Sequence, residues 1–342
     1  MGLRDQLEPL HLSPLWDVLH ALVPPQPDSP ADAALWRYDD VRPLLMQAGQ
    51  EITAEEAERR VLILENPGLV GTSAITRSLY AGVQLVLPGE VAPCHRHAQS
   101  ALRFVLEAST GSQGAYTAVN GEKVMMRPFD LVLTPTGLWH DHGNDSDAPI
   151  IWLDGLDIPL LQTLDCGYAE RYGEAQFPPS NRPGTTLSRF GQNMRPVRPS
   201  SVDTALAYQP LFHYPYDGWR GALMDMAATG APEPDLGYKM EFTNPVHGGP
   251  VMATISAFGH FLPKGFEASA YKQTSGAVYT VCEGSGTARI GDKRFALSPR
   301  DTFVVPSWQP LFLSANDDLI LFSFSDQAVQ DKLGLWRDSS TH

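Results

Sequence analysis

Short runs of apolar residues, separated by turn residues, dominate two long parts of the chain. The first part spans residues 61–160, where turn signals such as Pro88-Gly89 and Asn120-Gly121 divide the runs, and the second spans residues 251–326. Many short strands at fairly even spacing predict an all-β protein made of barrels or sandwiches. We expect strands over 61–64, 81–87, 101–106, 115–119, 123–126, 130–134 and 150–153, and again over 251–256, 277–281, 286–290, 302–305 and 319–324.

Helical spacing occurs mainly outside these two blocks. Apolar residues between 15 and 22 recur at the helical period. A further helix is expected from Pro43, with a break at Gly49 and a second helix capped by Thr53, because Glu56 follows three residues later. Helices are also expected over 216–228 and 327–336. The predicted organisation is an N-terminal helical extension (1–60), a barrel (61–160), a connecting segment (161–250), a second barrel (251–326) and a C-terminal helix and tail (327–342).

The two strand blocks align with each other as an internal repeat. Gly89 matches Gly265, Glu107 matches Glu283, and Asp130-(x4)-Pro135 matches Asp301-(x4)-Pro306. A repeat of this kind constrains the fold more strongly than any single strand prediction does. It predicts two barrels of the same design.

The composition bears on the partners of the protein and on its cellular location. The chain has 342 residues, 43% of them hydrophobic, with 25 basic and 39 acidic residues and a formal charge of −14. This balance argues against nucleic-acid binding, which needs a basic face. The three cysteines are far apart and odd in number, which favours reduced thiols. With an acidic N-terminus and no apolar run of membrane-spanning length, the sequence predicts a cytoplasmic protein without membrane contact.

Four of the ten histidines form two pairs, His95/His97 and His140/His142. Alternate residues of a strand point to the same face, so each pair can direct two imidazoles into one cavity. Imidazoles with few thiolates nearby suit iron, zinc, copper or nickel. We expect His95, His97 and His140 to bind one metal ion. In the repeat these three positions become Tyr271, Gln273 and Leu311, which predicts that the second barrel has no metal.

The histidine stretches match two motifs of the cupin superfamily. Gly89, His95 and His97 fit the first motif, which here lacks its usual glutamate; Pro135, Gly137, His140 and Asn144 fit the second, in which Phe129 replaces the first glycine. The segments His95-Arg-His-Ala-Gln-Ser-Ala-Leu-Arg-Phe104, Trp139-His-Asp-His-Gly-Asn144 and Trp152-Leu-Asp-Gly-Leu-Asp-Ile-Pro159 resemble the gentisate 1,2-dioxygenase family, which includes salicylate and 1-hydroxy-2-naphthoate dioxygenases. The chain is similar to a bicupin of this family over most of its length.

This resemblance implies an Fe(II)-dependent ring-cleaving dioxygenase of aromatic catabolism, in general a homotetramer. Its substrates would be O2 and a small aromatic 2-hydroxy acid whose carboxylate and ortho hydroxyl chelate the iron and supply the charge that the missing glutamate does not. The expected reaction converts gentisate and O2 to maleylpyruvate. Salicylate or 1-hydroxy-2-naphthoate remains an alternative substrate, and a non-catalytic metal-bound bicupin that binds a small molecule remains an alternative function.

Further residues are expected around the metal. Arg103 shares the parity of His97 and is expected to bind the substrate carboxylate, unless it forms a salt bridge with Glu107 or another acid inside the barrel. One of the adjacent Arg59 and Arg60 matches a second family arginine, and Arg59 is favoured.

The remaining expectations concern the walls of the pocket. Gln84, His142 and Asp154 resemble family pocket residues; His142 is expected near the substrate oxygen or dioxygen, and Asp154 near a histidine or the distal hydroxyl of gentisate. Gly82 shares the parity of Tyr80 and Gln84, is expected to face the ring, and could admit bulkier or less activated substrates.

Overall fold

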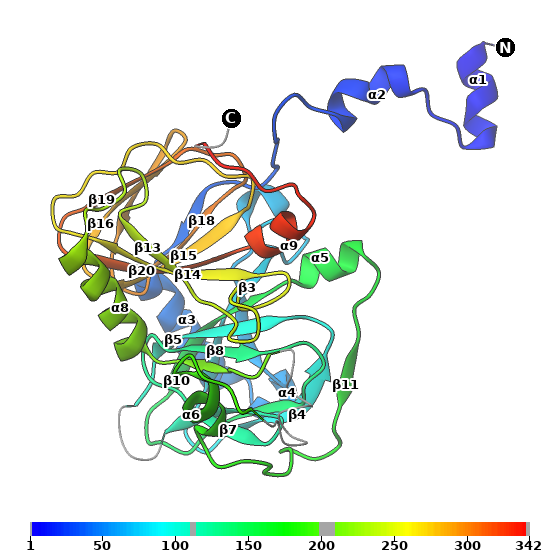
Figure 1. Cartoon of the computed structure of the whole chain (residues 1–342). Coiled ribbons are helices and arrows are strands. Elements are labelled where there is room, and N and C mark those ends of the chain that lie inside the picture. Colours follow the sequence, from blue (N-terminus) through cyan, green and yellow to red (C-terminus); the bar gives the residue numbers. More distant parts are fainter. Residues whose placement is uncertain (1, 110–113, 198–208, 340–342) are drawn as a thin grey trace.

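The two strand blocks fold as two β-barrels, one above the other in Figure 1, in the computed structural model of the chain. The structure describes residues 2–109, 114–197 and 209–339. The strands of the first barrel are β2 (Arg60–Ile63), β3 (Tyr80–Val86), β4 (Val91–His97), β5 (Ala101–Glu107), β6 (Ala115–Val119), β7 (Glu122–Met125), β8 (Leu131–Thr134), β9 (His140–Asn144), β10 (Ile150–Leu156), β11 (Ala169–Arg171) and β12 (His213–Tyr214). They form a six-stranded sheet, β12-β8-β5-β10-β3-β2, and a five-stranded sheet, β11-β4-β9-β6-β7.

The second barrel repeats this design with a smaller outer sheet. Its strands are β1 (Ala34–Trp36), β13 (Tyr238–Glu241), β14 (Ser256–Leu262), β15 (Ala277–Glu283), β16 (Gly286–Ile290), β17 (Lys293–Leu297), β18 (Thr302–Val305), β19 (Leu311–Ala315) and β20 (Leu319–Ser325). They form the sheets β1-β18-β15-β20-β14-β13 and β17-β16-β19. The prediction of an all-β bicupin is confirmed.

Helices lie at the ends of the chain and between the barrels. Their bounds are α1 (Leu3–Leu7), α2 (Leu15–Leu22), α3 (Tyr38–Glu51), α4 (Ala54–Ala57), α5 (Ile158–Thr163), α6 (Thr185–Phe190), α8 (Tyr216–Thr229) and α9 (Gln327–Lys332), with 3-10 turns at Glu8–Leu10 and Pro67–Leu69. Helices α1 and α2 extend away from the barrels, and none of their residues is buried (Figure 1). Within the described residues, no helix has both the length and the apolar character needed to cross a membrane.

The main hydrophobic core lies between the two six-stranded sheets. Phe104 of β5 stacks on Phe322 of β20, with ring centroids 4.0 Å apart and planes within 5°. One face of β3, β5 and β10 packs in this core and the other lines the first barrel, so their residues are buried almost throughout. This double burial explains why these strands read as continuous apolar runs rather than as alternating ones.

Helices α3 and α8 connect the barrels in matching ways. Asp301 of the second barrel accepts a hydrogen bond from the backbone N–H of Tyr38 (3.0 Å), while the Tyr38 hydroxyl and the Arg42 guanidinium bind Glu107 of the first barrel. On α8 the roles are exchanged: Asp130 of the first barrel accepts from the N–H of Tyr216 (2.8 Å), and Tyr216 and Arg220 bind Glu283 of the second barrel. The internal repeat therefore includes a helix before each barrel.

Matching turns support the alignment of the two repeats. Gly89 and Gly265 have φ values of 78° and 81°, and Phe129 and Arg300 have φ values of 66° and 71°. Phe129 stands where the cupin motif has a glycine and adopts the left-handed conformation for which glycine is usually needed.

Three local predictions were wrong. Helix α3 runs through Gly49 without a break. The glycine allows close packing instead, since a Cβ there would lie 2.9 Å from a methyl group of Leu85. Residues 251–254 form bends and residue 255 has no regular structure, although Val251 and Ile255 are buried; burial alone produced the apolar pattern. The C-terminal helix ends at Lys332 rather than at 336.

Strand pairing also crosses the expected segment boundaries. Strand β1 of the N-terminal extension pairs with β18, and β13 of the connecting segment pairs with β14, so both extend the sheet of the second barrel. Strand β12 pairs with β8 in the first barrel. The division of the chain into five segments stays a prediction.

Candidate metal centre

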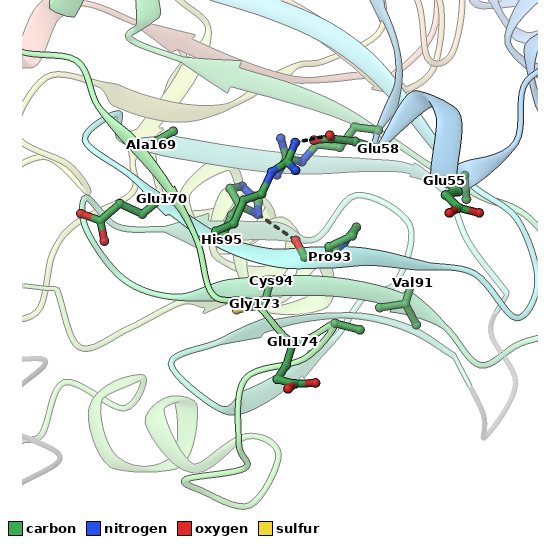
Figure 2. A pocket seen from close by; sticks show the side chains of 14 residues that line it. Glu55, Glu58, Val91, Pro93, Cys94, His95, Ala169, Glu170, Gly173 and Glu174 are labelled. Atoms are coloured by element: carbon green, nitrogen blue, oxygen red, sulfur yellow. Dashed lines mark hydrogen bonds and ion pairs between the residues drawn. The ribbon is translucent and has the colours of Figure 1, made fainter.

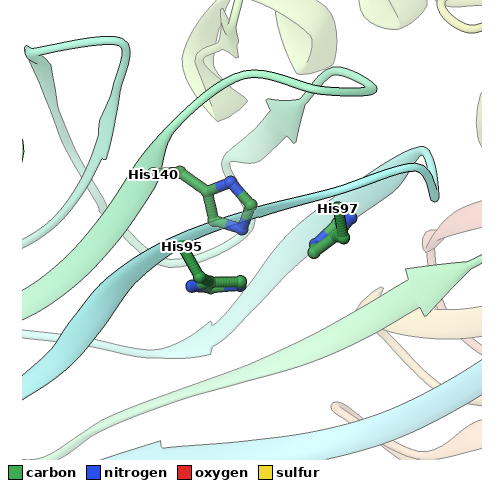
Figure 3. A group of neighbouring side chains, drawn as sticks. All are labelled: His95, His97 and His140. Atoms are coloured by element: carbon green, nitrogen blue, oxygen red, sulfur yellow. The ribbon is translucent and has the colours of Figure 1, made fainter. Parts of the chain in front are cut away.

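Three histidines meet inside the first barrel, on the neighbouring strands β4 and β9. His95 lies directly opposite His140 in the strand register, and His97 is two residues further along β4, on the same face. One ligand nitrogen from each ring lies within 4.8 Å of the others (Figure 3). Among the described residues, this is the group of three or more potential ligands that could hold a metal ion.

Backbone carbonyl groups fix the orientation of all three rings. Nδ1 of His95 lies 3.1 Å from the Pro93 carbonyl oxygen. The corresponding distances are 2.9 Å from His97 to the carbonyl of Gln99 and 2.9 Å from His140 to that of Leu138. A carbonyl oxygen can only accept, so each Nδ1 carries the proton and each Nε2 presents a lone pair. This is the arrangement in which imidazoles bind metal ions.

The electrostatic surroundings keep these imidazoles neutral. Burial, with the nearby Arg59, lowers the pKa of His95 to about 2, and burial with Arg103 lowers the pKa of His97 to about 4. Burial also holds the pKa of His140 well below its usual range. Neutral nitrogen donors, with no carboxylate or thiolate among them, fit a divalent transition metal whose charge is left for another ligand to balance.

His142 lies beside this group but is held differently. Its Nδ1 is 2.9 Å from the Thr117 hydroxyl, and its ring centroid is 5.7 Å from that of His140. The Thr117 hydroxyl donates to the sulfur of Met126 (3.2 Å). Thr117 therefore accepts from His142, which leaves Nε2 of His142, buried and without a hydrogen-bond partner, as a proton acceptor.

Arg103 lies inside the barrel on β5, opposite Asp154 of β10. Its Nη1 donates to the Thr134 hydroxyl (2.8 Å), and its Nε is 3.5 Å from Oδ1 of Asp154. Of the alternative partners expected from sequence, Glu107 binds Arg42 instead, whereas another acid of the barrel, Asp154, does pair with Arg103. The inward direction of Arg103 does not follow from sharing the parity of His97, because β4 and β5 are separate strands joined by residues 98–100.

Asp154 is the carboxylate that faces the two arginines in this cavity. Its Oδ1 accepts a hydrogen bond from the Trp152 indole (2.8 Å). Burial raises the pKa of Asp154 to about 6, against the opposing effect of Arg103. The same burial lowers the pKa of Arg103 to about 10. With Arg59, the cavity holds two guanidinium groups against one carboxyl group, so it is short of negative charge.

The adjacent arginines Arg59 and Arg60 point in different directions. Arg60 is buried and forms an ion pair with Glu90, and its Nε donates to the carbonyl of Ile52. Arg59 lines the hollow beside His95 and is electrostatically coupled to Asp154. Its Nε is buried without a hydrogen-bond partner, so Arg59 faces the metal centre and Arg60 supports the barrel wall.

Gln84 and Gly82 lie on β3, opposite Trp152 and Asp154. Gln84 is 1% exposed, and its amide nitrogen has no hydrogen-bond partner. A Cβ at Gly82 would lie 2.7 Å from the Tyr80 hydroxyl and 2.6 Å from a methyl group of Val61. The space beside Gly82 is thus filled by Tyr80 and Val61, contrary to the expectation that it leaves room for bulk. Sequence reasoning had not given Tyr80 a role.

Buried nitrogen atoms without partners gather at this site. Of the six buried side-chain nitrogen atoms without a partner in the described chain, five belong to Arg59, Gln84, Arg103, His140 and His142. Buried polar groups are rarely left unsatisfied, so their convergence indicates a ligand. A hollow of about 810 Å³ lies beside the site and is lined by His95, Arg59 and Glu58 among others (Figure 2).

A segment that the motifs did not reveal covers the outside of the histidine strands. Residues 167–181, called here the covering segment, include β11, which pairs with β4. Cys94 binds the segment through its backbone on both sides, to Ala175 and Tyr172, and Asp141 accepts a hydrogen bond from the N–H of Phe177 (3.0 Å). Its composition is mixed and carries no signal that would assign it to this face.

Comparison with known proteins gives consistent relationships. Residues 82–156 match the cupin domain. The chain is 49% identical to gentisate 1,2 dioxygenase 1 of Aquipseudomonas alcaligenes, covering 98% of this chain and 94% of that one. It is 36% identical to 5-aminosalicylate 1,2-dioxygenase of a Comamonas species, covering 99% and 90%. The crystal structure of salicylate 1,2-dioxygenase from Pseudoaminobacter salicylatoxidans with gentisate superposes with a TM-score of 0.89 at 32% identity, covering 98% and 92%.

Proposed function

Since this chain belongs to the gentisate 1,2-dioxygenase family of bicupin ring-cleaving dioxygenases, we propose that it converts gentisate and O2 to maleylpyruvate. In this reaction the carbon–carbon bond between the ring carbons that carry the carboxylate and the adjacent hydroxyl breaks. Both oxygen atoms of O2 enter the product, and the aromatic ring supplies the electrons, so the reaction needs no external reductant.

The main support is the set of unpartnered nitrogen atoms around a charge-deficient cavity. Arg59 and Arg103 keep free N–H groups there, and both guanidinium groups face a space that holds one carboxyl group, that of Asp154. A buried arginine is costly without an anion, and a carboxylate is the anion that matches its geometry. An aromatic 2-hydroxy acid carries this group next to a hydroxyl.

The metal is proposed to be iron, held by Nε2 of His95, His97 and His140. The neutral three-imidazole set fits Fe(II) among other divalent ions, and the choice of iron rests on the family. When bound, Fe(II) supplies a redox-active centre at which the substrate oxygens and O2 are brought together.

The surrounding residues are assigned to positions on the substrate. Arg103 and Arg59 bind and orient the carboxylate. His142, with Nε2 free and Nδ1 held by Thr117, accepts the proton of the ortho hydroxyl as the substrate binds. The side-chain amide of Gln84, which lies on β3, donates a hydrogen bond to a substrate oxygen. The buried walls of β3, β5 and β10 exclude water from the ring.

The wall of the cavity formed by Tyr80, Val61 and Asp154 favours gentisate over larger or less substituted aromatic 2-hydroxy acids. Tyr80 and Asp154 bring polar groups there, and Tyr80 and Val61 fill the space beside Gly82. This wall suits a second hydroxyl on a single ring better than the fused ring of 1-hydroxy-2-naphthoate. Salicylate would fit, but it would leave these polar groups without a partner.

The test is turnover by protein prepared without oxygen and loaded with Fe(II). Gentisate, salicylate and 1-hydroxy-2-naphthoate are added separately in air, while O2 uptake and ultraviolet spectra are followed. Gentisate should consume one O2 per molecule and give the highest kcat/KM. Preference for salicylate would replace the substrate assignment, and no O2 uptake with any of the three would refute the dioxygenase activity and favour a non-catalytic binding bicupin.

The enzyme is further proposed to act as a homotetramer in the cytoplasm. The helices α1 and α2 expose large apolar side chains, such as Trp16 at 69% and Leu22 at 65%, which a second copy of the chain could cover. The three cysteines are free, as expected where thiols stay reduced.

A further inference from the structure

The backbone turns sharply at Glu58, directly before the arginine that faces the metal centre. Glu58 has φ 53° and ψ −42°, and the N–H of Arg59 donates to the carbonyl of Ala57 at 2.5 Å. This is a γ-turn with positive φ at its central residue, a rare and strained form, most unusual at a glutamate. The turn separates α4 from β2 and sends Arg59 and Arg60 to opposite sides of the barrel wall.

The side chain of Glu58 forms an ion pair at the rim of the hollow beside His95. Its carboxylate forms an ion pair with Arg171, on β11 of the covering segment (Figure 2). The two partners are 54% and 79% exposed, and exposed pairs contribute little to stability. The contact therefore has little structural value of its own, although it lies on the rim of the hollow that leads to His95.

Two guanidinium groups compete at this rim. Arg59 and Arg171 lie close enough for their like charges to repel, and the carboxylate of Glu58 attracts both. Without Glu58, Arg171 would be free to bind an incoming carboxylate outside the barrel, and its charge would push on Arg59. With Glu58 bound to Arg171, Arg59 is left to face the cavity.

From this geometry we propose that Glu58 is a positioning residue for the substrate. Its γ-turn aims Arg59 at the metal centre, and its ion pair withholds Arg171 from the substrate carboxylate. The role rests on the proposed function, because it assigns Arg59 to an aromatic 2-hydroxy acid. It extends that function to two residues that do not touch the substrate.

The experiment compares four proteins loaded with Fe(II): wild type, Glu58→Gln, Arg171→Gln and the double variant Glu58→Gln/Arg171→Gln. The dissociation constant of gentisate is measured by calorimetry without O2. KM, kcat, bound iron and Tm are then measured for the same four proteins. Glu58→Gln breaks the ion pair with Arg171, which is then free to compete for the substrate carboxylate, so Kd and KM should rise about tenfold. The kcat, iron content and Tm should stay near those of wild type. Glu56→Gln, which removes the same charge two residues away on the exposed side of α4, is the matched control and should bind as wild type does.

The double variant provides the decisive comparison. If Glu58 acts by withholding Arg171, removal of Arg171 in the Glu58→Gln background should restore Kd to within about threefold of wild type. A double variant that binds as poorly as Glu58→Gln, a Glu58→Gln variant that binds as tightly as wild type, or a Kd that follows a lowered Tm would each overturn the assignment. A wild type that binds gentisate but consumes no O2 would refute the proposed reaction and leave this comparison intact; a wild type that does not bind it would overturn both.

Discussion

Arg103 and Asp154 face each other on neighbouring strands inside the first barrel, with Nε of Arg103 3.5 Å from Oδ1 of Asp154. Both residues are buried, Arg103 at 4% and Asp154 at 5% exposure, yet no hydrogen bond joins Nε to the carboxylate. The carboxylate balances the charge of the arginine while leaving the N–H free. Because this N–H has no partner, the buried pair can bind a further anion.

Replacement of Arg103 tests the carboxylate contact. Arg103→Gln should lower kcat/KM for gentisate by about 100-fold or more, mostly through KM, because a charge-assisted contact to the substrate is lost. Steady-state kinetics with iron analysis would measure this. Arg289→Gln, an exposed change on β16, is the control and should leave kcat/KM unaltered. An unchanged KM in Arg103→Gln would place the substrate carboxylate elsewhere.

His140→Ala should lose bound iron and activity together. Nε2 of His140 is buried without a partner and the ring lies against those of His95 and His97, so the variant loses one of the three ligand nitrogens. Metal analysis after dialysis should find about one iron per chain in wild type and much less in the variant. The exposed His247→Ala serves as the control. Full iron content in His140→Ala would show that the ligand assignment is wrong.

His142→Ala should separate metal binding from catalysis. Because His142 is assigned to the substrate proton rather than to the metal, the variant should retain iron while kcat falls by about 100-fold or more. Thr117→Val should have a smaller effect, since it removes only the acceptor that fixes the ring of His142. The measurement is kcat with iron content in the same preparations; loss of iron from His142→Ala would move His142 into the ligand set.

Asp154 should make the stability of the metal-free protein depend on pH. Burial raises its pKa in the folded protein to about 6, above the ordinary value of 3.8. The folded protein therefore keeps a proton that the unfolded chain has lost, and the contribution is fully stabilising below pH 4 and is lost as pH rises through 6. Relative to Asp154→Asn, wild type should lose about 2–3 kcal/mol of unfolding free energy between pH 4 and pH 7.

Urea unfolding of both proteins at several pH values would measure this difference. Parallel pH profiles for wild type and Asp154→Asn would show that the carboxyl group titrates normally in the fold.

The exposed helix α2 should hold the assembly together. Trp16→Asp combined with Leu19→Asp would place charges on an apolar face that no described residue of the same chain covers. If this face binds another copy, the variant should have a lower mass by light scattering at micromolar concentration, with the barrels still folded by circular dichroism. An unchanged mass would remove α2 from the interface.

The sequence predicted the three-histidine group well because strand parity and motif spacing both indicated it. Parity is preserved by the hydrogen-bonded register of β4 and β9, although that register shifts between Ala92 and His95. The same reasoning gave the right direction for Arg103 for the wrong reason, since a turn separates it from His97. Parity holds within a strand and does not carry across a turn.

Other parts of the site depend on contacts between distant segments and could not be predicted. The choice between Arg59 and Arg60 is decided by a γ-turn at a non-glycine residue, for which Glu58 carries no sequence signal. The filling of the space beside Gly82 depends on how Tyr80 and Val61 pack from two strands. Gly49 shows the same limit, because its role in close packing cannot be distinguished from a helix break without knowing its neighbour Leu85.

The exchanged contacts of α3 and α8 have a consequence for the second barrel. Each helix begins on a carboxylate of one barrel and delivers a tyrosine and an arginine to a carboxylate of the other. Removing the second half would take α8 and its contact with Asp130 away, leave the start of α3 without Asp301, and expose the face of Phe104. The first barrel therefore depends on the second for its folded structure, although the second has Tyr271, Gln273 and Leu311 where the first has its three histidines.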